Sequence, residues 1–162
     1  MSVPVRLRAL ESARKYFGVK ENPKDSNRGV LIDRWNTEAG VPVGSSGCMS
    51  FVHAMYLACG VKLGGWASVG FFETWAAANG DLVKRPFKGD IVCYDWNGDN
   101  WPDHVGIVER VLALRWKDKV FAGWIQTVEG NTSPGTFGSQ SDGDGVYRRR
   151  RWAHNCKFVR VK

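Results

Sequence analysis

The hydrophobic pattern of this chain changes its period near the middle, which limits the folds open to it. Before residue 80, apolar residues recur at helical spacing, and each such stretch ends at a glycine: Gly18, Gly40, Gly60 and Gly80. After residue 90, short apolar runs alternate with turn residues. Helices followed by antiparallel strands predict an α+β fold, with N-terminal helices packed on a C-terminal sheet.

We expect helices over residues 4–17, 27–40, 48–60 and 68–80, the second of them capped by Asn27. Strands are predicted over residues 90–94, 104–111, 120–129, 146–148 and 158–161. The 162 residues contain no internal repeat and no long linker, so the sequence predicts a single domain over residues 1–162.

The net charge of +7 indicates an anionic partner, and nucleic acid, a membrane surface or an anionic cell wall would all fit. The first residues mix basic and apolar side chains without the apolar core of a secretory signal, and no stretch is long enough to cross a bilayer. We therefore expect synthesis in the host cytoplasm without a signal peptide. The four cysteines are far apart, which argues against a structural zinc site.

Cys48 follows a short flexible segment, Ser45-Ser46-Gly47, and begins the third predicted helix. At the first turn of a helix, free N–H groups and the helix dipole favour a thiolate, the reactive form of cysteine. The position therefore indicates a nucleophile. The alternative is an ordinary small core residue, because cysteine is among the most often buried types.

A nucleophilic cysteine needs a base, and His104 is the best placed of three histidines. His53 lies on the helix of Cys48 but points elsewhere, and His154 falls in a segment without a predicted element. His104 begins a strand after a turn, with its neighbours Val105 and Ile107 alternating toward the core, so we expect it to face a cleft. A polar strand end is the alternative.

Glu129 and Asn131 end the strand predicted from residue 120 and share one face if the backbone stays extended. Either side chain could accept a hydrogen bond from the imidazole and fix its tautomer. The alternative is a plain turn, since Glu-Gly-Asn-Thr is common loop chemistry.

Four segments together resemble the CHAP family, the cysteine, histidine-dependent amidohydrolases/peptidases. They are Gly-Cys-Met-Ser-Phe-Val at 47–52, Gly-Asp-Ile-Val at 89–92, Asp-His-Val-Gly-Ile-Val-Glu at 103–109 and Thr-Val-Glu-Gly-Asn-Thr at 127–132. The resemblance implies a papain-like fold and a single CHAP-like catalytic domain. It also implies that Cys48 is the nucleophile, His104 the base, Glu129 the group that orients it, and Asn131 a supporting polar group.

One position departs from the family pattern. Members often carry an aromatic residue or Gln immediately before the cysteine, and here that residue is Gly47. We therefore assign the oxyanion hole to backbone N–H groups near Cys48, with Ser46 as a further candidate.

The resemblance implies a peptidoglycan hydrolase, a cell-wall lysin most like the phage endolysins. It would be bacteriolytic and act at the cell wall or in the periplasm. The bond cut would be the amide between muramic acid and L-alanine, or a peptide bond of the stem or cross-bridge. Two alternatives stay open: a non-catalytic wall- or polyanion-binding module on the same fold, and an antibacterial toxin effector with the same chemistry.

Oxygen side chains alternate at Asp95, Asn97 and Asp99, which makes a calcium site worth testing. An EF-hand loop would need Gly and Glu where Asn100 and Gly106 stand. A hairpin turn at Asn-Gly is the better interpretation, so no cofactor is expected.

The densest basic run is Arg148-Arg149-Arg150-Arg151. It is either a solvated strand end with arginines on alternate sides or a contact for anionic wall or membrane surfaces. No nucleic-acid motif accompanies it, so we expect no nucleic-acid partner, and we expect a monomer. Exposed tryptophans, for example Trp96 or Trp101, could stack on sugar rings.

Overall fold

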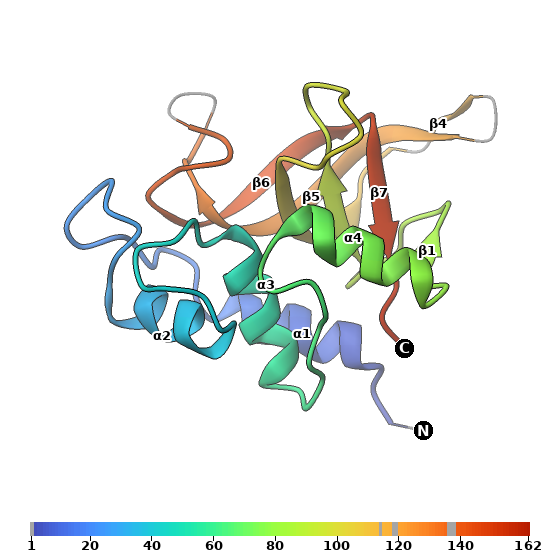
Figure 1. Cartoon of the computed structure of the whole chain (residues 1–162). Helices are drawn as coiled ribbons and strands as arrows, with labels where there is room; N and C mark the ends of the chain where they lie inside the picture. The colour runs from blue at the N-terminus through green and yellow to red at the C-terminus, as the bar shows by residue number, and fades with distance from the viewer. Residues whose placement is uncertain (1, 114, 118–119, 136–138) are drawn as a thin grey trace.

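Helices come first and strands second, as Figure 1 shows for a computed structural model that describes residues 2–113, 115–117, 120–135 and 139–162. The described helices are α1 (Val5–Arg14), α2 (Val30–Glu38), α3 (Cys48–Leu57) and α4 (Val69–Ala78). The described strands are β1 (Leu82–Val83), β2 (Ile91–Tyr94), β3 (His104–Val111), β4 (Arg115–Lys117), β5 (Val120–Thr132), β6 (Gly145–Ala153) and β7 (Cys156–Val159). The α+β prediction is therefore confirmed.

Three details differ from the sequence-based expectation. Asn27 does not cap α2: its own φ is 53°, and Gly29 occupies the N-cap position. The short strands β1 and β4 were not predicted. The strand predicted over residues 146–148 extends from Gly145 to Ala153, because β6 pairs with β5 along almost its whole length. An arginine-rich segment can continue a strand when its neighbour supplies the hydrogen bonds.

The strand pairs of the described sheet are all antiparallel, in the order β1-β7-β2-β3-β5-β4, and β6 pairs with β5. The helices cover one face of this sheet, below it in Figure 1. α3 lies in the middle of the main core, and every residue from Cys48 to Tyr56 is buried. A helix buried on all sides agrees with its apolar sequence and fixes the position of its first residue.

The other face of the sheet carries a smaller apolar cluster: Val92, Tyr94, Val108, Ile125, Ala153 and Phe158. His104 pairs with Tyr94 across β2 and β3, so both side chains project from this second face.

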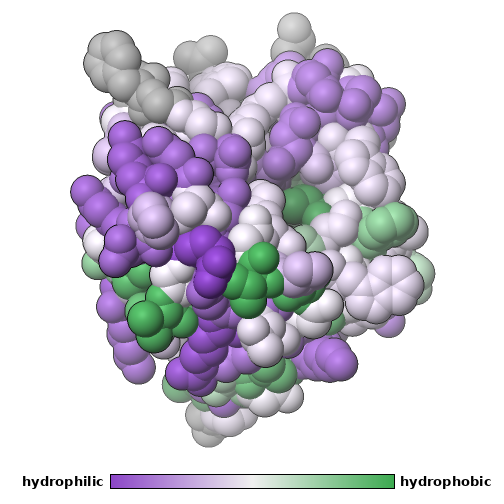
Figure 2. Space-filling model, turned by 60° about the vertical axis from the view of Figure 1, so that its left-hand side comes forward, coloured by the Kyte–Doolittle hydropathy of each residue, from purple (hydrophilic) through white to green (hydrophobic). Residues whose placement is uncertain are grey.

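The exterior is mixed. On the face that Figure 2 turns forward, hydrophobic residues form separate patches among hydrophilic ones. In the described part of the chain, none of the helices has the length and apolar character required to span a membrane.

Candidate active site

Cys48 is the first residue of α3, and its side chain is buried. The N–H of Phe51 donates to the carbonyl of Gly47 (2.9 Å), so the helical hydrogen bonds begin one residue before the cysteine. Asn36 Nδ2 donates to the carbonyl of Ser45 (3.0 Å) and holds the preceding loop against α2. The sulfur thus lies at the positive end of the helix dipole, and the loop that precedes the helix is held in place.

His104 is the first residue of β3 and is fully buried. Its Nε2 lies 3.0 Å from Glu129 Oε2. Its Nδ1 has no hydrogen-bond partner of ordinary geometry within the described residues, yet Cys48 lies near enough to perturb the ring. Burial lowers the pKa of His104, but the interactions with Cys48 and Glu129 outweigh it and raise the pKa to about 9. The imidazole is therefore protonated at neutral pH.

Glu129 is buried in β5 and accepts several hydrogen bonds besides that of His104. Its Oε1 accepts from Thr127 Oγ1 (2.6 Å) and Tyr94 Oη (3.2 Å), and its Oε2 accepts from Arg151 Nη2 (2.6 Å). Burial raises the pKa of Glu129, but the bond and charge of His104, followed by those of Arg151, lower it to about 2. The carboxylate stays ionised and cannot rotate, so it fixes the ring of His104.

Gly106 makes room for this carboxylate. A Cβ at that position would lie 2.7 Å from Glu129 Cγ, a separation that real Cβ atoms do not show. The glycine of the Asp-His-Val-Gly segment is therefore needed for a close approach between β3 and β5.

Arg151 belongs to the site, although the sequence placed it only in a basic run. Its Nε lies 3.1 and 3.2 Å from the two oxygens of Glu129, and its side chain is only 11% exposed. The guanidinium also lies over Trp96 and Tyr94, at 5.2 and 5.9 Å from the ring centroids. Trp96 in turn stacks on His104 (5.5 Å, 22°). Arg151 thus neutralises Glu129 and is held by the aromatic rings that cover the base.

The four consecutive arginines therefore differ in surroundings. Arg149 is buried and donates to Gln140, whereas Arg148 is half exposed and bonds Glu109 (2.6 Å). Alternation along β6 places Arg148 and Arg150 on one side and Arg149 and Arg151 on the other. The pattern could have indicated that two of the four point inward, but not which buried acid they meet.

Asn131 makes no hydrogen bond to the imidazole in the described part of the chain, where Nε2 of His104 contacts Glu129 and Nδ1 has no partner. It has a left-handed φ of 55°, and the register of β5 with β6 shifts between Glu129 and Thr132, so the extended geometry that would put Glu129 and Asn131 on one face is absent. Asn131 Nδ2 donates to Ser46 Oγ (3.0 Å) and to the carbonyl of Ser141 (3.1 Å). It holds the loop that leads into Cys48.

The three side chains considered as calcium ligands accept hydrogen bonds from backbone N–H groups. Asp95 accepts hydrogen bonds from two backbone N–H groups (2.8 and 2.9 Å), and Asn97 and Asp99 each accept one (3.0 and 2.8 Å). These bonds shape a loop over residues 95–103, longer than the tight hairpin that Asn-Gly predicted. Within the described ranges, no group of three or more His, Cys, Asp or Glu is arranged to hold a metal ion.

Cys48, His104 and Glu129 therefore come together from α3, β3 and β5. A thiol beside an imidazole that a carboxylate orients can attack an amide carbonyl and pass a proton to the leaving amine. Peptide N–H groups around Cys48 can serve as donors for the oxyanion. Ser46 Oγ accepts a hydrogen bond from Asn131 Nδ2, which leaves its hydroxyl hydrogen able to donate as well.

Residues 36–131 match the family model described as the CHAP domain. The match includes Cys48, His104 and Glu129 and ends before Arg151. Curated proteins and solved structures gave no match. CHAP domains are peptidoglycan-related amidases and peptidases, and they are generally hydrolases. Since the family model covers more than half of the sequence, the chain belongs to the CHAP-domain family.

Proposed function

We propose that this chain hydrolyses an amide bond of bacterial peptidoglycan through a thiolate mechanism. The buried contact series Cys48–His104–Glu129 carries the proposal, because it joins a sulfur at a helix start to a protonated imidazole and an ionised carboxylate. The family supplies the substrate class.

The reaction takes two steps. The Cys48 thiolate attacks the amide carbonyl, and the imidazolium of His104 gives its proton to the leaving amine as the C–N bond breaks. A water that loses a proton to His104 then attacks the resulting thioester, which releases the carboxylic acid and restores the Cys48 thiolate and the His104 imidazolium. Glu129 keeps the ring oriented and stabilises its charge throughout.

The bond that is cut is either the amide between muramic acid and L-alanine or a peptide bond of the stem or cross-bridge. We place the action at the cell wall or in the periplasm, as for a phage-type lysin, and a delivered antibacterial effector would use the same chemistry. The exposed arginines of β6, Arg148 and Arg150, together with the net charge of +7, favour contact with anionic wall polymers.

Digestion of purified sacculi, followed by mass spectrometry of the released termini, tests the proposal. New L-alanine amines identify an amidase, and any other new amine identifies an endopeptidase. Cys48→Ala should abolish release while the protein still binds sacculi. A Cys48→Ala protein with full biological effect would instead indicate a binding module.

Thiol labelling tests the activation of Cys48 separately. Cys48 is more buried than Cys59, which lies in the turn after α3, so accessibility alone favours Cys59. Faster alkylation of Cys48 by iodoacetamide near neutral pH would therefore report its reactivity. Slower alkylation of Cys48, matched to its burial, would count against a thiolate.

A further inference from the structure

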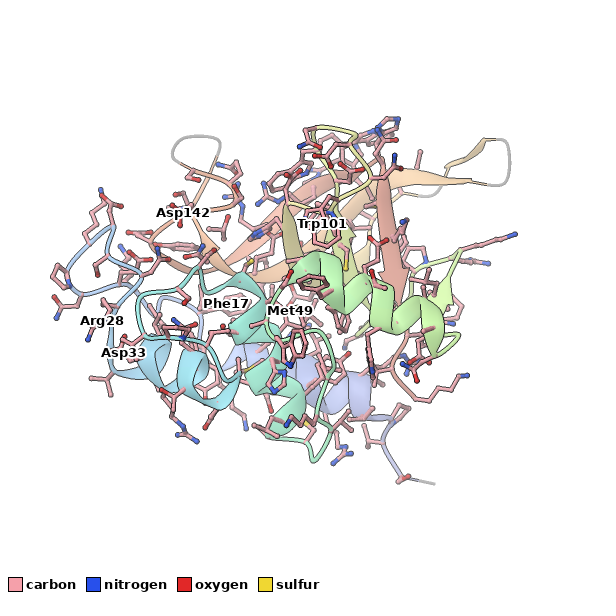
Figure 3. All side chains as sticks on the ribbon, in the orientation of Figure 1. Phe17, Arg28, Asp33, Met49, Trp101 and Asp142 are labelled. Carbon is pink, nitrogen blue, oxygen red and sulfur yellow. The ribbon has the colours of Figure 1, made fainter. Side chains whose placement is uncertain are left out.

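Trp66, Phe71 and Trp101 form a row of exposed aromatic rings beside α4, which we name the aromatic ledge. Phe71 meets Trp66 edge-on (6.2 Å, 73°) and Trp101 edge-on (5.4 Å, 90°). Their exposed fractions are 80% for Trp66, 52% for Phe71 and 48% for Trp101. Figure 3 shows Trp101 above α4. Three adjoining large aromatic side chains left in solvent are unusual in a chain with a well-filled core.

The backbone around these three rings adopts unfavourable geometry to place them there. Gly70 of α4 lies against Trp101, and a Cβ there would come within 2.3 Å of the indole. Trp66 has a left-handed φ of 48°, which is unfavourable for a bulky residue, and Ala67 follows with a φ of 58°. Because Trp66 stays exposed, its own burial does not compensate for that conformation.

One loop links the aromatic ledge to the candidate active site. The loop over residues 95–103 carries Trp101 toward α4 and Trp96 onto His104. Its ends are closed by Asp103, whose N–H donates to the carbonyl of Tyr94 (2.7 Å) and whose carboxylate accepts from the N–H of Trp96 (2.7 Å). This loop therefore joins the ring at one end of the ledge to the ring that covers His104.

We infer that the aromatic ledge binds the glycan strand of peptidoglycan, which deepens the proposed function and rests on it. The apolar C–H faces of pyranose rings stack on aromatic planes while their hydroxyl and N-acetyl groups stay in water. The charged side chains of the neighbouring loop, Asp95, Asp99 and Asp103, are all acidic and would repel an anionic polymer, whereas a strand of N-acetylated hexosamines with amide-linked lactyl groups is uncharged. The stem that hangs from the strand then reaches Cys48.

Titration of the full chain with the N-acetylglucosamine tetramer, followed by calorimetry, tests this. Trp66→Ala and Trp101→Ala should each weaken binding on the order of tenfold, as expected for the loss of one stacking ring. Trp66 is the safer variant because it is the most exposed, and melting curves check the fold of both. Trp152→Ala is the matched control: Trp152 forms an exposed edge-on pair with Trp124 (5.5 Å, 68°) on β5 and β6, and its loss should leave binding unchanged.

Equal tetramer binding by wild type and Trp66→Ala, or an equal loss in Trp152→Ala, would overturn the inference. So would sedimentation in which the Trp66 and Trp101 variants abolish self-association but keep tetramer binding, because the occupant would then be a second copy. Sacculus digestion by the wild type separates the two proposals. If the protein does not digest sacculi but its sugar binding depends on the ledge, only the hydrolase proposal fails. If it digests sacculi and its sugar binding does not depend on the ledge, only the ledge proposal fails.

Discussion

Two buried carboxylates, Glu129 and Glu109, have similar surroundings but differ in whether one of their hydrogen-bond partners can titrate. They lie on the neighbouring strands β5 and β3, and each is bonded by an arginine of β6, Arg151 in one case and Arg148 in the other. Burial raises the pKa of each, and polar partners lower both to about 2.

Their remaining partners differ. Glu109 accepts from Arg14 Nε (2.8 Å) and Gln126 Nε2 (2.6 Å), neither of which changes charge near neutral pH. Glu129 instead bonds His104, which titrates. A strongly lowered carboxyl pKa therefore does not by itself mark an active site. What distinguishes Glu129 from Glu109 is a partner that can gain and lose a proton.

Glu129→Gln should have the largest effect on turnover and should distinguish Glu129 from Glu109 most clearly. An amide cannot stabilise the imidazolium and can hold the ring in the wrong tautomer, so turnover of sacculi should fall by roughly 10³-fold. Circular dichroism should show a retained fold. An unchanged rate would assign the orienting role to another group.

Glu109→Gln should change stability and leave turnover intact. Breaking a buried pair leaves Arg148 and Arg14 without a counter-charge; because Arg148 is half exposed, we expect a loss of roughly 2 kcal/mol in the free energy of unfolding, below the usual cost for a fully buried pair. Urea titration measures it. A fall in turnover at full stability would show that Glu109 also serves the reaction.

Arg151→Gln should reduce kcat by about tenfold, because Glu129 loses its bidentate partner. The wild-type rate should decline as the pH rises through about 9, where His104 loses the proton that the leaving amine needs. Removing a nearby positive charge favours the imidazolium, so this alkaline limb should move to higher pH in the variant. Arg151→Lys, which keeps the charge, is the control; a limb that stays in place would reduce Arg151 to a structural role.

His53 provides the smallest test, because it is buried with no hydrogen-bond partner for either ring nitrogen among the described residues. Burial, followed by the charge of Lys62, lowers its pKa below 6.5. The unfolded chain therefore binds the proton more readily, and the contribution of His53 to stability should be lost as the pH falls below 6.5. Melting temperatures at pH 7 and pH 5.5 should differ less in His53→Gln than in wild type. An equal difference would exclude His53 as the cause.

The sequence was sufficient for the fold class and for the elements that present Cys48, His104 and Glu129, because apolar periodicity and glycine stops are local signals. It was insufficient for the backbone at Asn131, whose left-handed φ and neighbouring register shift depend on pairing with β6. The contact of Arg151 with Glu129 was not predicted for a similar reason. A run of arginines indicates that alternate side chains lie on opposite faces, but the register between β5 and β6 decides which residue each one contacts.

The dependence of Glu129 on β6 has a consequence for where the working unit ends. A shortened protein that stops where the family match stops, at residue 131, would keep Cys48, His104 and Glu129 but would remove Arg151, the cation paired with the Glu129 carboxylate. Such a fragment should be less stable than the full chain, because the buried carboxylate would keep only His104, Thr127 and Tyr94 as partners. Strand β6 thus supplies the positive charge that balances Glu129. The functional unit therefore extends beyond residue 131, where the match to the family model ends.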